Sequence, residues 1–216
     1  MQTFGTGHFL YLLNGLLWTV ILSSLAMSLG SVAGFAVMLG RISRRRWVRR
    51  LSGAWVQTIQ GTPLLIQMFI IYFGLGVLGI SVPALAAATV ATMIYASAYL
   101  GEIWRGCVQS IAKTQFEAAE AMGLSRWQAL RDVILPQAAR IATPPTVGFT
   151  VQLIKNTSLA SVVGFLELTR SAQVINNSLF EPFLVFGIAA ALYFAVCYPL
   201  SLWSRSLERK LNVGRR

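Results

Sequence analysis

Residues Leu51 to Gly101 read LSGAWVQTIQGTPLLIQMFIIYFGLGVLGISVPALAAATVATMIYASAYLG and contain no Asp, Glu, Lys or Arg. A helix that crosses the hydrocarbon core of a bilayer needs about 20 apolar residues. This stretch is therefore long enough for two crossings and a turn. Glycines, Ser81 and Pro83 within 74–83 indicate the turn. We expect membrane spans at 54–77 and 82–104.

Three further stretches are almost free of charge. Residues 1–40 and 182–204 contain no charged residue, and 141–166 contains only Lys155. Each fits one span, and we place these spans at 9–39, 142–166 and 182–204. The expected fold is an all-α integral membrane protein, with residues 1–216 forming one domain of five transmembrane helices.

The composition agrees with a membrane protein and argues against several other classes. Of the 216 residues, 56% are hydrophobic and 12% are charged, about half the charged fraction of a typical soluble domain. Two cysteines and one histidine leave too few ligands for a disulfide framework, a four-cysteine zinc site or a histidine-ligated metal. We therefore expect no bound metal.

The positive charges predict how the spans are oriented. Sixteen of the 18 Lys and Arg residues fall within 41–50, 105–140 and 205–216, and such residues favour the cytoplasmic side. We expect the N-terminus outside the cell and the C-terminus in the cytoplasm. Because the basic residues follow every inner connection rather than one domain, nucleic-acid binding is disfavoured.

The predicted cytoplasmic loop, 109–140, contains two capping-box patterns. Thr114 with Glu117 and Ser125 with Gln128 each have the spacing that begins a helix. Gly123 is expected to end the first helix, and the second should end near Pro136. Apolar side chains in this short loop, which no bilayer covers, indicate a protein partner.

The same loop resembles the EAA motif of ABC importer permeases. The shared residues are Glu117-Ala118-Ala119, then Gly123, then Val133-Ile-Leu-Pro136, with Val133 where the family pattern has Ile. Four more stretches resemble the polar amino-acid branch of that family: 61–67 (GTPLLIQ), 98–105 (AYLGEIWR), 135–140 (LPQAAR) and 155–159 (KNTSL). Three residues depart from common choices of the branch: Gln60, Gly148 and Asn156.

The resemblance implies a type I importer in the bacterial inner membrane. It implies a second permease chain, identical or related, two ATPase subunits and an extracytoplasmic solute-binding protein. ATP and Mg would bind the ATPases, since no lysine of this chain ends a GxxxxGK[ST] loop, and this chain would not be an enzyme. The residues expected to couple to the ATPase are Glu117, Ala118, Ala119, Gly123 and Leu124.

The substrate prediction rests on Lys155. Counted from Ile141, it lies about 21 Å along the fourth span, where a lysine costs roughly 2.5–3.5 kcal/mol on insertion scales. A solute carboxylate would compensate this charge, with the following hydroxyls as donors; snorkelling and an ion pair with Glu102 or Glu167 are the alternatives. The predicted substrate-binding residues are Lys155, Asn156, Thr157, Ser158 and Thr62.

Other residues are candidates for the pathway or a gate. Pro63 should bend or break the second span, and a broken helix either lines a cavity or is satisfied by its neighbours. Tyr95 is polar enough to line a pathway. Glu102 and Arg105 have the spacing of a helical ion pair, and a gate is the alternative. Glu167 and Arg170, at the same spacing, predict a structural pair or a contact with the binding protein.

Two other function classes fit the sequence less well. A membrane-embedded enzyme would need a nucleophile and base or a metal cluster, but the sequence has no HExxH, no GxSG and no carboxylate pair inside a span. A small channel or scaffold that recruits a partner through 109–140 is the remaining alternative to a transporter. ATP-dependent uptake would separate a transporter from a channel.

Overall fold

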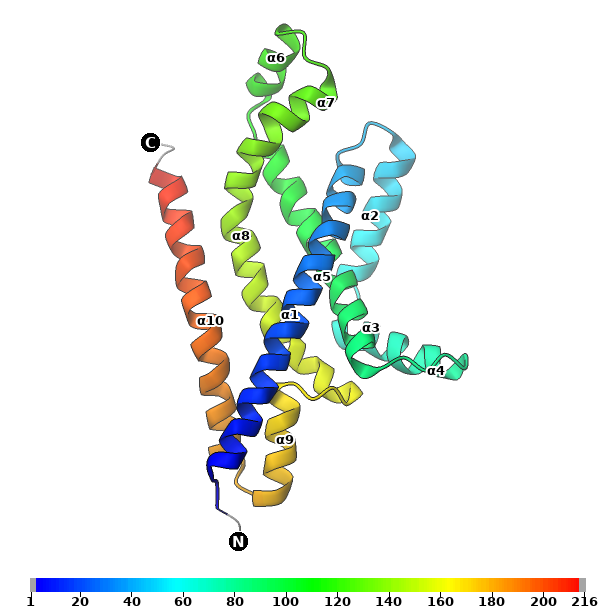
Figure 1. The fold of residues 1–216 in the computed structure, drawn as a ribbon. Coiled ribbons are helices and arrows are strands. Elements are labelled where there is room, and N and C mark those ends of the chain that lie inside the picture. The colour runs from blue at the N-terminus through cyan, green and yellow to red at the C-terminus, as the bar shows by residue number, and fades with distance from the viewer. Residues whose placement is uncertain (1–2, 214–216) are drawn as a thin grey trace.

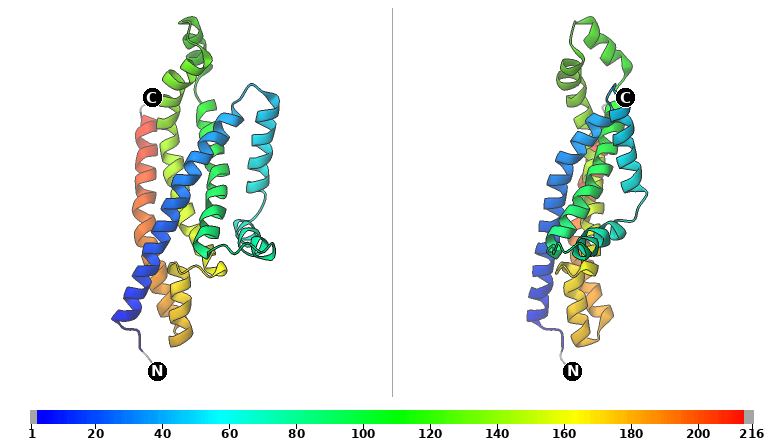
Figure 2. Two further views of the ribbon diagram at one scale, coloured as in Figure 1. Left: turned by 45° about the vertical axis from the view of Figure 1, so that its right-hand side comes forward. Right: turned by 90° about the vertical axis from the view of Figure 1, so that its right-hand side faces the viewer.

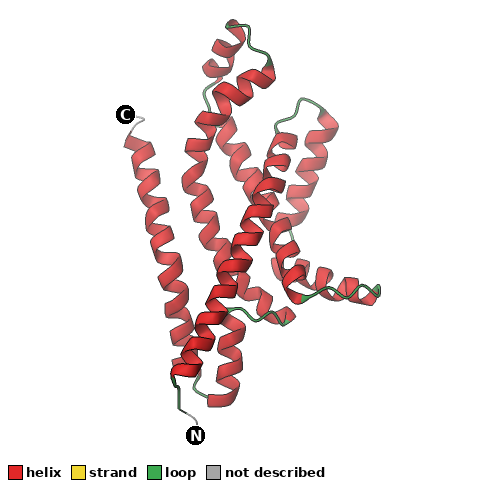
Figure 3. Cartoon of the chain, viewed as in Figure 1, coloured by secondary structure: helices red, strands yellow, loops and turns green. Residues whose placement is uncertain are grey.

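The computed structural model describes residues 3–213, and within that range every regular element is a helix (Figure 3). Three helices are long and apolar enough to cross a membrane: α1 (Thr6–Arg41), α5 (Ala84–Gln109) and α10 (Pro182–Val213). Two bent helix pairs bring the number of candidate spans to as many as five. The start of α1 and the end of α10 lie at opposite ends of the molecule (Figure 1).

The predicted second span is not one continuous helix. It consists of α2 (Arg46–Gln60), then α3 (Leu64–Phe69), the π-helix η1 (Ile70–Gly74) and α4 (Leu75–Val77). The two halves meet at an angle of 98°. Pro63 lies at the break, as expected of a residue that lacks the N–H needed to continue a helix. The second half therefore turns away from the direction of α2 (Figure 1).

The connection between α5 and the next long helix folds into α6 (Lys113–Ala121), α7 (Arg126–Gln128) and the π-helix η2 (Ala129–Ile134). The capping box at Ser125 is confirmed: its backbone N–H donates to Gln128 Oε1 at 2.9 Å, and Gln128 N–H donates to Ser125 Oγ at 3.4 Å. The capping box at Thr114 is wrong. The helix begins at Lys113 with Ala112 as its capping residue, two residues earlier than predicted, so Thr114 already lies inside its first turn.

The expected helix end near Pro136 is also wrong. The chain continues from η2 into α8 (Leu135–Asn156), and Pro136 lies in the first turn of α8. Proline disrupts a helix through its missing N–H and its clash with the carbonyl four residues earlier. Here that carbonyl belongs to Asp132 in the π-helical turn, whose wider hydrogen-bonding pattern accommodates the ring.

The predicted fourth span ends early as an α-helix. After Asn156 the chain tightens into the 3₁₀-helix η3 (Thr157–Val163), and α9 (Leu168–Leu179) follows at a bend of 50°. The predicted ion pair between Glu167 and Arg170 is wrong. Glu167 is fully buried and accepts hydrogen bonds from Arg170 N–H at 2.7 Å, Thr169 N–H at 2.8 Å and Tyr193 OH at 2.8 Å. Its carboxylate caps α9 and ties it to α10, so Glu167 itself is inaccessible in this conformation, whereas Arg170 is half-buried.

The core forms where α1, α3, α5 and α8 meet. Leu22, Met68, Leu100 and Leu153 are fully buried there. Helix α1 lies along one face of the bundle and crosses it obliquely (Figure 2). Gly30 allows its close approach to α5, because a Cβ at this position would lie 2.5 Å from Ala96 Cβ. Apolar side chains such as Val32 and Phe183 remain exposed on the outside, as expected of surfaces that face lipid.

Candidate functional site

The predicted substrate residues of the fourth span lie where α8 changes into η3. Lys155 is exposed, Asn156 and Ser158 are half-buried, and Thr157 is fully buried. The Thr157 hydroxyl donates to Ile154 O and the Ser158 hydroxyl donates to Lys155 O, both at 2.7 Å. The expectation that these hydroxyls are free donors is therefore wrong in this conformation, because each proton satisfies a backbone carbonyl of the tightened turn.

Lys155 forms neither of the two ion pairs considered from the sequence. Glu102 pairs with Arg41 and Arg105, and the Glu167 carboxylate caps α9. The salt bridges found among residues 3–213 do not include Lys155. Its ammonium group is thus exposed and without a carboxylate partner in the described part of the chain.

The break around Pro63 is closed by a side chain that sequence reasoning did not assign. Gln67 on α3 is buried, and its Nε2 donates to Ile59 O at 2.9 Å, to Thr62 O at 3.1 Å and to Thr62 Oγ1 at 2.9 Å. The Thr62 hydroxyl itself donates to Thr58 O at 2.9 Å. Neighbouring groups thus satisfy the carbonyls that the break frees. Helix α3 packs against η3, so the two interrupted spans adjoin.

An aromatic cluster lies between α5 and α8. The ring centroids of Tyr95 and Tyr99 are 4.3 Å apart, and those of Tyr99 and Phe149 are 5.7 Å apart. Gln152 Nε2 donates to Tyr95 OH at 3.2 Å. Sequence reasoning found Tyr95 but missed Phe149 and Gln152. Their spacing of three residues along α8, ending at Lys155, was the available signal.

The Glu102–Arg105 pair is present and extends to a third residue. Arg105 Nε donates to Glu102 Oε1 at 2.9 Å, and Arg41 Nε donates to Glu102 Oε2 at 3.3 Å. The carboxylate therefore links the end of α1 to α5. Arg41 was missed because it is 61 positions from Glu102, and helical spacing reveals only local pairs.

The stretch around Glu117 forms an exposed helix beyond the ends of α5 and α8, at the same end of the molecule as the end of α10 (Figure 1). Glu117 and Ala118 are exposed, Leu124 is half-buried, and Ala119 is fully buried, so the Ala119 side chain supports α6 from inside. Gly123 ends the helix with φ +73°, as predicted. Leu124 N–H then donates to Ala119 O at 3.1 Å.

Residues 26–213 of this chain match the model of a protein family, the binding-protein-dependent transport system inner membrane component. This chain belongs to that family. The permease is similar to GlnP of Bacillus subtilis, named a probable glutamine ABC transporter permease protein, with 39% identity over 206 residues, 93% of this chain and 94% of the relative. It is similar to YckA of Bacillus subtilis, named a probable amino-acid ABC transporter permease protein, with 35% identity over 202 residues, 94% of this chain and 89% of the relative.

Solved structures agree with this assignment. The permease matches a chain of a crystal structure described as an amino acid ABC transporter with histidines, with a TM-score of 0.89 and 31% identity, covering 97% of this chain and 100% of the other. An inward-facing MetNI methionine ABC transporter has a TM-score of 0.78 at 19% identity, covering 96% and 99%, and shows the shared fold. The permease is thus a transporter subunit and not itself an enzyme. Within residues 3–213, no group of three or more His, Cys, Asp or Glu is placed to hold a metal ion.

Proposed function

We propose that this permease imports polar amino acids across the bacterial inner membrane, as a multi-pass chain that forms the solute pathway with a second permease. Two cytoplasmic ATPases supply the energy, and an extracytoplasmic binding protein delivers the solute. The similarity to permeases named for amino acids supports the solute class. The exposed α6 and the residue that follows it, Met122, 68% exposed, support the ATPase partner. An apolar residue so placed favours a protein partner.

The proposed solute site is the face of α8 that ends at Lys155. An exposed ammonium group without a carboxylate partner suits a solute carboxylate, and Gln152 and Asn156 add amide groups nearby in the sequence. Ser158 is half-buried and already donates its proton, so its oxygen is available as an acceptor for a solute ammonium. Asn156 carries no negative charge, which favours neutral or acidic amino acids over cationic ones.

Uptake by the reconstituted complex tests the function. Proteoliposomes that contain the permease, its ATPases and its binding protein should accumulate at least one common neutral or acidic amino acid only when ATP is present. The mass of the purified complex should correspond to two permease chains and two ATPases. Solute flux that is equal with and without ATP would favour a channel and overturn the proposal.

The proposed orientation places the start of α1 outside and the α6–α7 segment and the end of α10 in the cytoplasm. The partition of positive charge supports it, as does the grouping of the α1–α2 turn with α6 and α7 at one end (Figure 1). After replacement of Cys107 and Cys197, a cysteine at Arg45 should react with an impermeant maleimide only in permeabilised cells. A cysteine at Ser81 should react in intact cells. The reverse labelling pattern would show that the proposed topology is inverted.

A further inference from the structure

A basic cavity lies between the α1–α2 turn and the α6–α7 segment. Its volume is about 1030 Å³, and Glu120 is the acidic residue on its wall. Six basic side chains line it: Arg41, Arg44, Arg45, Arg49, Lys113 and Arg126. Among the salt bridges of the described residues, only Arg41 of these six takes part, with Glu102. The wall of this cavity thus carries a large excess of uncompensated positive charge.

Hydrogen bonds hold the cations in this arrangement. Arg126 Nη2 donates to Ile42 O at 3.1 Å, which joins α7 to the α1–α2 turn. Arg49 Nη1 donates to Ser43 O at 3.1 Å, which fixes the same turn from α2. Arginines gathered from separate elements repel one another unless an anion lies between them. The geometry therefore suits a phosphate, for which arginine is a preferred partner.

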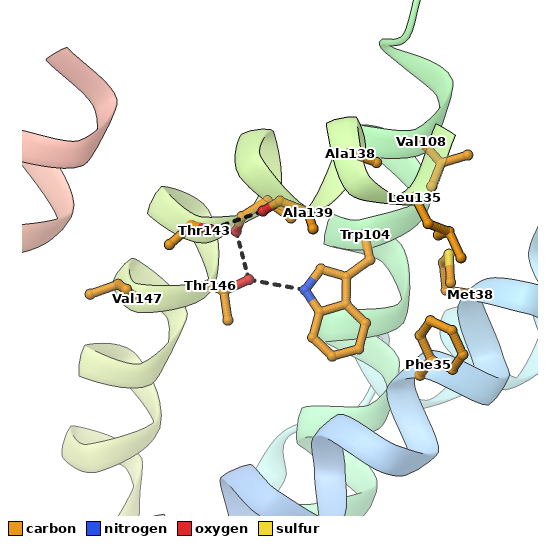
Figure 4. A pocket seen from close by; sticks show the side chains of 11 residues that line it. Phe35, Met38, Trp104, Val108, Leu135, Ala138, Ala139, Thr143, Thr146 and Val147 are labelled. Atoms are coloured by element: carbon orange, nitrogen blue, oxygen red, sulfur yellow. Dashed lines mark hydrogen bonds between the residues drawn. The ribbon is translucent and has the colours of Figure 1, made fainter. Parts of the chain in front are cut away.

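An apolar pocket of about 370 Å³ (Figure 4) shares one lining residue with the basic cavity. Phe35 and Met38 on α1, Trp104 on α5 and residues of α8 surround it (Figure 4). Val108 lines both spaces. Phe35 and Met38 of the pocket lie about one turn apart on α1, and Ile42 of the cavity follows the last residue of that helix. The two spaces therefore meet at one buried side chain, Val108, which is 5% exposed.

The polar groups in the pocket wall already have partners. Trp104 Nε1 donates to Thr146 Oγ1 at 2.9 Å, and the Thr146 hydroxyl donates to Ala142 O at 2.7 Å. The Thr143 hydroxyl donates to Ala139 O at 2.9 Å. Because these donors are used, the pocket suits an occupant with no hydrogen-bonding groups.

We propose that the basic cavity and the apolar pocket together bind one anionic phospholipid, with its phosphate among the arginines and an acyl chain in the pocket. The cations lie at the end of the spans, where lipid headgroups are found. An acidic protein surface would match the charge but would leave the adjoining apolar pocket empty. The inference depends on the membrane location of the family and not on the identity of the solute.

Lipid retention by the assembled transporter tests the inference. The complex with its ATPases is placed in nanodiscs of mixed phosphatidylglycerol and phosphatidylcholine, extracted mildly, and its bound lipid is counted by native mass spectrometry. Wild type should retain phosphatidylglycerol preferentially. Arg44→Gln/Arg45→Gln should reduce that retention by roughly tenfold or more, from two lost charges near the membrane surface.

The chain offers a matched control. Arg46→Gln/Arg50→Gln removes the same charge from the same arginine run, at positions that do not line the cavity, and should retain the lipid. Ala139→Phe keeps every arginine but fills the apolar pocket, so it should also reduce the retention of phosphatidylglycerol. If Arg44→Gln/Arg45→Gln does not assemble, this variant tests the inference in its place.

Three results would overturn the inference. If Arg44→Gln/Arg45→Gln and Arg46→Gln/Arg50→Gln lost equal amounts of bound phosphatidylglycerol, only the overall charge would attract the lipid. Displacement of the lipid by millimolar inorganic phosphate would mean that the site binds free phosphate without an acyl chain. Loss of the ATPase from Arg44→Gln/Arg45→Gln, with lipid retention unchanged, would assign the cavity to the ATPase surface.

Discussion

Replacement of Lys155 with Met should abolish amino-acid uptake while the transporter still assembles with its ATPases and binds its loaded binding protein. The methionine keeps most of the length of the side chain but removes the charge. Lys155 is exposed and is absent from the salt bridges of the described residues. Its removal therefore breaks no salt bridge found in the fold, and the effect should fall on solute binding rather than on stability.

The decisive measurement is the rate and Michaelis constant of uptake in proteoliposomes. Lys210→Met provides a matched control, since Lys210 is also exposed but lies near the end of α10. This control should transport like wild type. If Lys155→Met also kept the wild-type rate and Michaelis constant, the lysine would be a snorkelling residue with no part in solute recognition.

Replacement of Gly123 with Val should uncouple solute delivery from ATP hydrolysis. Gly123 has φ +73°, a left-handed conformation that costs an L-residue roughly 1–2 kcal/mol and a β-branched residue more. Nothing lies within 4 Å of a Cβ at this position, so the cause would be backbone strain rather than a clash. The strain would displace α6 from the position that the following turn gives it.

Solute-stimulated ATPase activity of the purified complex reports this uncoupling. Gly106→Val is a suitable control, because a Cβ there also meets nothing within 4 Å and its backbone is helical. Gly106→Val should keep the solute-stimulated ATPase activity of wild type. The activity of Gly123→Ala should lie between those of Gly106→Val and Gly123→Val. Full stimulation in Gly123→Val would show that the geometry of this turn has no role in coupling.

Local features of the fold could be predicted because local interactions cause them. Charge-free stretches locate the long helices α1, α5 and α10, since a bilayer core excludes charge. Pro63 breaks its helix, Gly123 ends one and Ser125 begins one, each through the backbone conformation or hydrogen bonds of its own turn. The charged partners of a residue are predictable in the same way only within one helix, as for Glu102 and Arg105.

Sequence reasoning failed where a local rule met an unusual helical turn or a partner that is distant along the chain. Whether Pro136 would end a helix depended on a π-helical turn before it. The partner of Glu167 was not the nearby Arg170 side chain but Tyr193 on α10. In the first case an adjacent π-helical turn accommodates the proline, and in the second a residue 26 positions away accepts the role of partner.

The sequence by itself therefore determined that this chain is a helical membrane protein that resembles ABC importer permeases, and that Pro63 interrupts one of its spans, because hydrophobicity and proline act through their immediate surroundings. Only the tertiary structure decided the 98° turn after Pro63, the link from Arg41 to Glu102 and the use of the Thr157 and Ser158 protons. The first two depend on which helices pack together across long stretches of chain. The last depends on how tightly α8 winds as it becomes η3, because the shorter turn brings each hydroxyl onto the carbonyl three residues earlier.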